Sequence, residues 1–144
     1  MHDFNIENKF WHGLGRNRFA KYFNQLKILE MSNLEDDGLC LELGVFKATS
    51  LIRLAHHLRN LQPNKLIYGF DVFGEFPQSS DPSSQDRLFL DDWKRTAGDG
   101  LKKEQVEEIL KDIDVENVRL IEGDIRVTLK DFLEKMKRPI SFVI

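Results

Sequence analysis

The sequence predicts an α/β protein whose doubly wound, mostly parallel sheet carries helices on both faces. Short apolar runs of strand length alternate along the chain with longer segments in which apolar residues recur every three or four positions. The first three runs end at a glycine or an acid, which is typical of strands that lead into a loop. Such alternation indicates parallel strands joined by right-handed helical crossovers. With 144 residues, 41% of them hydrophobic, the chain has room for one domain with a core.

The apolar runs set the bounds of the expected strands, and the segments with apolar residues every three or four positions set those of the expected helices. Strands are expected at 39–43, 65–71, 118–121 and 139–144. Helices are expected at 19–34, 49–61, 87–96, 102–113 and 128–136. Thr49 or Ser50 is expected to cap the second helix, because either hydroxyl can accept a hydrogen bond from a first-turn N–H. The first helix is expected to bury one apolar stripe, formed by Tyr22, Phe23, Leu26 and Leu29.

The charge and composition exclude several classes of partner. A net charge of −3 leaves no basic excess for a nucleic-acid backbone or an anionic membrane. The first ten residues hold no apolar core, and no apolar run approaches the roughly 20 residues of a membrane span. The single cysteine, Cys40, allows no disulfide within the chain and is expected to be buried. The protein is therefore expected to be cytoplasmic, without nucleic-acid or membrane partners.

Acidic residues mark the ends of the first three expected strands. Glu42 and Asp71 end the first two, and Asp124 follows the third. In an open parallel sheet, ligands bind at the carboxyl ends of the strands, where the strand order reverses. Gly44 lets the backbone of the first loop come close to a ligand, and the helix that follows presents free N–H groups. The sequence therefore predicts a ligand site at this edge of the sheet.

Three stretches, LELGVFKATS, GFDVFGEFP and VRLIEGDIRVTLKDFL, occur in this order along the chain. Together they resemble the class I S-adenosylmethionine-dependent methyltransferases, which have a Rossmann-like fold, and among them the macrocin O-methyltransferase (TylF-like) family. One departure is Ala48, which stands where many members of the family have a glycine.

The resemblance implies a site for S-adenosyl-L-methionine. Glu42 and the Gly44 turn, with Val45 and Phe46, would receive the methionyl end of the cofactor. Asp71 would accept the ribose hydroxyls, since a carboxylate can accept both hydrogen bonds of a vicinal diol. Beside the adenine, the resemblance places Asp124 with Ile125. Phe73 is expected either to wall the adenine or to pack in the core.

The end of the sequence shapes the expected domain organisation. In the family, the metal-binding and catalytic acids follow the fourth strand, whereas this sequence ends at Ile144. We therefore expect a helical arm or lid over 1–38 and, over 39–144, the front part of a methyltransferase domain whose sheet is incomplete on its C-terminal side. No catalytic residue or metal ligand is expected in this chain, and a divalent metal such as Mg²⁺ would belong to a longer protein. The apolar fourth strand would be an exposed edge, through which the chain could form a homo-oligomer.

The leading interpretation is methyl transfer to a hydroxyl of a small molecule, with a sugar of a glycosylated natural product implied by the resemblance. Two alternatives remain. A strand, glycine loop and helix with an acid on the next strand also describe an NAD-type oxidoreductase, although the loop has Gly44 alone in place of G-x-G-x-x-G. A binding module with this fold and no catalysis is the other alternative.

Overall fold

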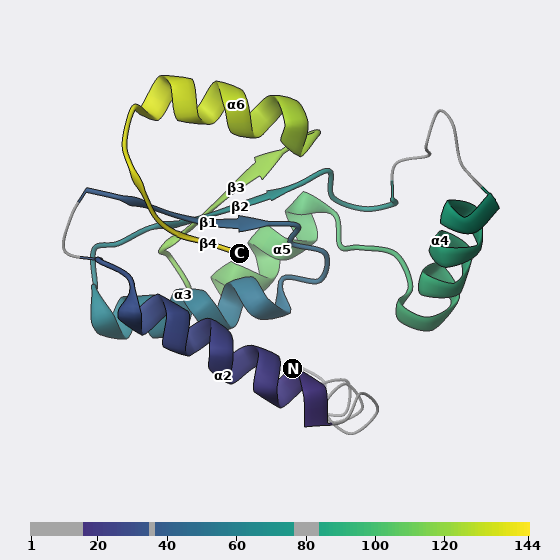
Figure 1. Cartoon of the computed structure of the whole chain (residues 1–144), viewed down its shortest axis with the longest axis horizontal. Helices are drawn as coiled ribbons and strands as arrows, with labels where there is room; N and C mark the ends of the chain where they lie inside the picture. Colours follow the sequence, from purple (N-terminus) through teal and green to yellow (C-terminus); the bar gives the residue numbers. More distant parts are fainter. Residues whose placement is uncertain (1–15, 35–36, 77–83) are drawn as a thin grey trace.

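The computed structural model describes residues 16–34, 37–76 and 84–144 (Figure 1). Residues 1–15 of the expected N-terminal arm, and 77–83 of the loop after the second strand, lie outside the described residues. The described elements are, in order, α2 (Arg16–Met31), β1 (Leu39–Leu43), α3 (Thr49–Leu61), β2 (Ile67–Asp71), α4 (Ser84–Ala97), α5 (Lys103–Asp112), β3 (Val118–Glu122), α6 (Ile125–Met136) and β4 (Ile140–Val143).

The four strands form one parallel sheet in the order β3-β2-β1-β4. From β1 the chain crosses over to β2 and then to β3 on one side of the sheet. It then returns to place β4 on the other side of β1. The strand order reverses next to β1, which is where a doubly wound sheet opens a crevice for ligands. The predicted α/β class and parallel sheet are confirmed.

Helices cover both faces of the sheet, as Figure 1 shows. On one face α6 packs over Leu39, Leu41 and Phe70. The opposite face carries α2, α3 and α5, whose core is the larger of the two (Figure 1). It includes the fully buried Leu54 and Val106. Helix α4 lies apart from both layers, beyond the carboxyl ends of β1 and β2 (Figure 1). No helix among the described residues combines the length and apolar character needed to cross a bilayer.

Helix α3 starts at 49 as expected but is capped differently, while α2, α4 and α6 each begin three residues before the expected start. Neither Thr49 nor Ser50 caps α3; its N-cap is Ala48, which makes no side-chain cap hydrogen bond. Helix α6 begins at Ile125, three residues before the expected start at 128, because Asp124 is its N-cap and accepts a hydrogen bond from the Arg126 N–H (2.9 Å). The carboxylate of Asp124 therefore supports the helix that follows β3.

The expected stripe on α2 is only partly buried. Leu29 is fully buried, but Phe23 is 60% exposed, so the prediction that Phe23 faces the core is wrong. Tyr22 contacts α3 instead, with the guanidinium of Arg53 5.2 Å from the centre of its ring. The helix thus packs along α3 through one narrow edge of its surface.

Gly69 on β2 allows α3 and its preceding loop to lie close to the sheet. A Cβ atom at Gly69 would stand 2.8 Å from Val45 Cγ2 and 2.9 Å from Leu51 Cδ2, both closer than van der Waals contact. Val45 and Leu51 are themselves buried in the core. A side chain at Gly69 would therefore push the β1–α3 loop away from the strand ends that it serves.

Candidate functional site

The carboxylate of Asp71 joins the two loops at the predicted edge of the sheet. Its Oδ2 accepts hydrogen bonds from the N–H groups of Val45 (2.6 Å) and Phe46 (2.8 Å), and its Oδ1 accepts one from the Phe73 N–H (2.9 Å). A carboxylate has about four acceptor positions, so one remains for a ligand. Asp71 therefore fixes the shape of the site before any ligand binds, a role that sequence reasoning did not assign to it.

The β1–α3 loop forms a turn with room above it. Gly44 has φ +101° and is exposed, and nothing lies within 4 Å of the position a Cβ atom would take there. Ala48, at the start of α3, also has a positive φ of 59°, which explains why a glycine suits this position. The first N–H groups of a helix lack an intrahelical acceptor, so the start of α3 offers donors for an anionic group beside this turn.

Glu42 is buried beneath the same turn. Glu42 is 3% exposed, and the Ser50 hydroxyl donates a hydrogen bond to its Oε1. Its other oxygen, Oε2, has no hydrogen-bond partner among the described residues. Burial raises the pKa of Glu42 to about 7, against the opposing effects of the Ser50 hydrogen bond and the charge of Lys21, while the charge of Asp71 raises it further. A buried carboxyl with one unsatisfied oxygen is well suited to a cationic ligand group.

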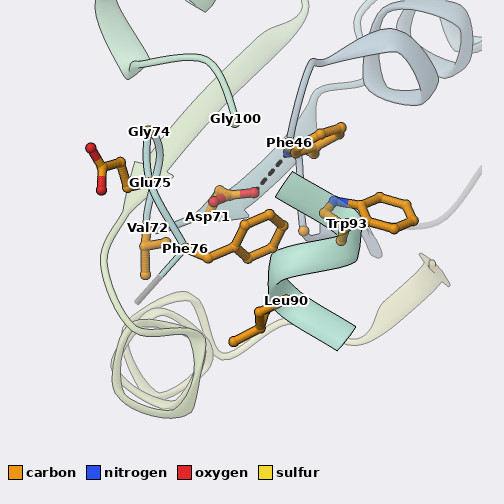
Figure 2. Close-up of a pocket in the computed structure, with 10 residues that line it drawn as sticks. Phe46, Asp71, Val72, Gly74, Glu75, Phe76, Leu90, Trp93 and Gly100 are labelled. Carbon is orange, nitrogen blue, oxygen red and sulfur yellow. Dashed lines mark hydrogen bonds between the residues drawn. The ribbon is translucent and has the colours of Figure 1, made fainter. Parts of the chain in front are cut away.

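A cavity of about 330 Å³ opens between these loops and α4 (Figure 2). Rings line one side of it: the centre of the Phe46 ring lies 6.0 Å from that of Phe76 and 5.8 Å from that of Trp93. Asp71 and Glu75 are the charged side chains among the lining residues. The full lining consists of Gly44, Phe46, Asp71, Val72, Gly74, Glu75, Phe76, Leu90, Trp93 and Gly100.

The segment after α4 is hydrogen-bonded to the β1–α3 loop and to the loop after β2. The Leu101 N–H donates to the Phe46 carbonyl (3.0 Å), and the Gly74 N–H donates to the Leu101 carbonyl (2.9 Å). In addition, Lys47 Nζ donates to the Ala97 carbonyl in the last turn of α4, where a cation also favours the helix dipole. These bonds place α4 against the site although none of its described side chains belongs to either core cluster.

The remaining predicted residues lie around the β2 and β3 ends. The Gly123 N–H donates to the Asp71 carbonyl (2.9 Å), which brings Asp124 and Ile125 to the same edge as Asp71. The Asp124 carboxylate is exposed and paired with Arg126, whose hydrogen bonds lower the pKa of Asp124 to about 2. Phe73 is buried in the core on the α3 face and does not line the cavity. Its alternative role, as a wall for adenine, stays a prediction.

Five side chains of the cavity were not predicted from the sequence: Val72, Glu75, Phe76, Leu90 and Trp93. Phe76 lies in the stretch GFDVFGEFP, where Phe73 was the expected wall, and the positive φ of Phe73 (55°) and Gly74 (74°) turns the chain between the two rings. Ser50 was expected as a cap, yet it is a partner of Glu42. Among the described residues, no group of three or more His, Cys, Asp or Glu side chains could hold a metal ion.

Known proteins offer a comparison at the level of the fold. No family model matches the chain, and no curated protein matches it. The solved O-methyltransferase NovP aligns with a TM-score of 0.60 and 21% identity, over 81% of this chain and 48% of its own. CalS11, a calicheamicin methyltransferase, aligns with a TM-score of 0.54 and 20% identity, over 90% of this chain and 54% of its own. The chain thus shares the Rossmann-like fold of these methyltransferases and spans about half the length of the solved structures that it matches.

Proposed function

We propose that this chain binds S-adenosylmethionine and is the cofactor-binding portion of an O-methyltransferase that acts on a small molecule. The observation that carries the proposal is the buried Glu42 carboxyl, whose Oε2 has no partner in the described part of the chain, beneath the open turn at Gly44. We further propose a macrocin O-methyltransferase-like protein that methylates a sugar hydroxyl, which rests on the sequence motifs. The two methyltransferases of the same fold support the reaction class.

The polar groups at the strand ends fit the cofactor. Glu42 would receive the ammonium group of the methionyl end, and the N–H groups at the start of α3 would receive its carboxylate. Asp71 would accept from the ribose with the position that its three backbone hydrogen bonds leave open. When bound, S-adenosylmethionine supplies an electrophilic methyl group on a positively charged sulfur. The chain's own contribution is to hold that group still and to exclude water from it with the rings around Phe46.

The described residues do not offer a set of ligands for the divalent metal that the family resemblance implies. We therefore assign no step of the reaction to a metal held by these residues. The proposal for this chain is cofactor binding and orientation.

Calorimetric titration with S-adenosylhomocysteine tests the proposal. At pH 8 we expect measurable binding, and Glu42→Gln should weaken it at least about tenfold, because a hydrogen bond to a charged group is lost. The affinity of the unmodified chain should fall from pH 8 to pH 6 as Glu42 takes up its proton, and the affinity of Glu42→Gln should not. Glu134→Gln, an exposed carboxylate on α6, is the matched control.

Two outcomes would overturn the proposal. One is the absence of S-adenosylhomocysteine binding, and the other is an affinity that Glu42→Gln leaves unchanged. A parallel titration with NAD separates the methyltransferase from a dinucleotide-binding oxidoreductase, since NAD binding without S-adenosylhomocysteine binding would favour the latter.

A further inference from the structure

The turn between β1 and α3 has a strained backbone on both sides of Lys47. Phe46 has a φ of 51° and Ala48 a φ of 59°, which place both in the left-handed region that residues other than glycine seldom adopt. Gly44 also has a positive φ, but a glycine adopts it without steric cost. Left-handed residues that carry a Cβ atom persist where the surrounding structure holds them in place. The turn therefore depends on contacts from other parts of the chain.

Two other segments hold the peptide groups of Phe46. Its N–H donates to the Asp71 carboxylate at the end of β2 (2.8 Å), and its carbonyl accepts from the Leu101 N–H (3.0 Å). Asp71 ends a strand of the sheet, whereas Leu101 follows α4, whose described side chains belong to neither core cluster. Because Leu101 lies four residues past the end of α4, its hydrogen bond depends on how that end is anchored.

The side chain of Lys47 anchors the end of α4. Its Nζ donates to the carbonyl of Ala97, the last residue of the helix, and lies 5.3 Å from the centre of the Phe46 ring. The last carbonyls of a helix lack intrahelical donors, and the helix dipole favours a cation beside them. Nζ also lies 3.6 Å from the position that a Cβ atom would take on Gly98, the next residue. Lys47 is half-buried, so water screens this interaction less than it would screen one on the surface.

We propose that Lys47 is a positioning residue for cofactor binding: by capping the end of α4, it holds the strained turn at Phe46 and Ala48 in the conformation that binds the cofactor. The proposal rests on the proposed function. Lys47 acts through the backbone of its two neighbours, and no contact between Lys47 and the cofactor is required. The Phe46 ring also lies 5.8 Å from that of Trp93 on α4, so the helix and the turn meet through a ring contact as well (Figure 2).

Calorimetric titration with S-adenosylhomocysteine tests the effect on binding. Lys47→Met keeps a side chain of similar length that cannot donate, and it should weaken the affinity at least about tenfold. Lys130→Met, at an exposed position of α6, removes the same charge and should leave the affinity unchanged. Adding Ala48→Gly to Lys47→Met should recover most of the lost affinity, because glycine adopts the positive φ without strain and the turn then needs no anchor.

Hydrogen exchange in the absence of any ligand tests the hold on the turn itself. In Lys47→Met the Leu101 N–H should exchange at least about fivefold faster, measured by NMR, because its bond to the Phe46 carbonyl opens more often. The Val115 N–H, which donates to the Leu110 carbonyl (2.9 Å), is the control. It should exchange at an unchanged rate, which separates local opening from a loss of overall stability.

Three results would overturn the proposal. Two are an unchanged affinity of Lys47→Met and an unchanged exchange rate of its Leu101 N–H. The third is a weakened affinity that Ala48→Gly does not recover, because Lys47 would then contact the cofactor itself. If the unmodified chain does not bind S-adenosylhomocysteine, the proposed function fails, and the exchange of the Leu101 N–H still decides whether Lys47 holds the turn.

Discussion

Asp71 is the residue on which the geometry of the site depends most directly. Its two oxygens accept three N–H groups from residues 45, 46 and 73, so one carboxylate fixes both loops. Hydrogen bonds to a charged acceptor stabilise the folded chain more than those to a neutral acceptor. Without this carboxylate, the three N–H groups would lose water on folding and gain no other partner. The proposed ligand role of Asp71 and this structural role therefore cannot be separated by its removal alone.

We expect Asp71→Asn to lower the free energy of unfolding by about 2 kcal/mol or more, because the amide nitrogen cannot accept the hydrogen bonds of the loops. Urea unfolding followed by circular dichroism measures the change. Asp131→Asn, an exposed acid on α6, is the control and should stay within about 0.5 kcal/mol of the unmodified chain. Equal stabilities of the Asp71→Asn and Asp131→Asn variants would contradict the structural role of Asp71.

Glu42 makes the stability of the chain depend on pH. Because burial raises its pKa to about 7 in the folded state, the folded chain holds a proton that the unfolded chain loses near pH 4.5. Its contribution to stability is therefore fully present below about pH 4.5 and is lost as the pH rises to about 7. The full effect is roughly 3 kcal/mol.

The variant Glu42→Gln cannot ionise, so we expect it to match the unmodified chain at pH 4.5 and to exceed it in stability at pH 8. Urea unfolding of both proteins at several pH values measures the difference between them, which removes the shared contribution of the histidines. A difference that does not change with pH would show that folding does not raise the pKa of Glu42.

At the scale of elements, the contact between β2 and the β1–α3 loop depends on Gly69. We expect Gly69→Ala to destabilise the chain by about 1–3 kcal/mol, the usual cost of overpacking, since Val45 is stiff and buried. In a Leu51→Ala background the same substitution should cost less, because one of the two colliding side chains is gone. Thermal and urea unfolding of the four proteins form a double-mutant cycle, and additive costs would contradict the proposed collision.

The elements themselves could be predicted well from the sequence. The central strand β1 was predicted with its observed bounds, and β2 to β4 differ by one or two residues at their ends, because apolar runs between turn residues leave little choice. The start of α6 was predicted late, since a cap is visible only when the backbone geometry of Asp124 is known. Which side chains of α2 are buried depends on how α3 packs against it, and the spacing of apolar residues within α2 does not reveal that packing.

The candidate site could be predicted only along the sheet. Glu42 and Asp71 lie at the carboxyl ends of β1 and β2, and Gly44 follows β1 directly, so the parallel topology alone brings them to one edge. Leu90 and Trp93 reach the site through the hydrogen bonds of residues 97–101, which join segments far apart in the sequence. The local sequence of α4 contains no sign of those bonds.

At the scale of the whole molecule, β4 leaves one edge of the described sheet open. Ile140 and Val143 on this strand are 45% and 49% exposed, and an apolar edge of this kind pairs readily with another chain. We expect the 144-residue chain to self-associate as its concentration rises, and Val143→Lys to shift it toward the monomer. Sedimentation or light scattering measures the mass. Val127→Lys, at an exposed position of α6, should leave the association unchanged.

If the unmodified chain is monomeric at every concentration, the edge is not a pairing surface. Loss of association in both lysine variants would instead attribute it to net charge, because each variant adds one positive charge to a chain of net charge −3.

The segment from β2 to α5 combines two properties. It supplies Phe76, Leu90 and Trp93 to the cavity, while the described side chains of α4 contribute to neither core cluster. Substitutions on α4 can therefore alter what the cavity accepts without a matching change in the packed interior. For protein engineering, α4 is therefore a segment whose residues 84–97 can be diversified to change the cavity while the sheet and the Gly44 turn stay as they are.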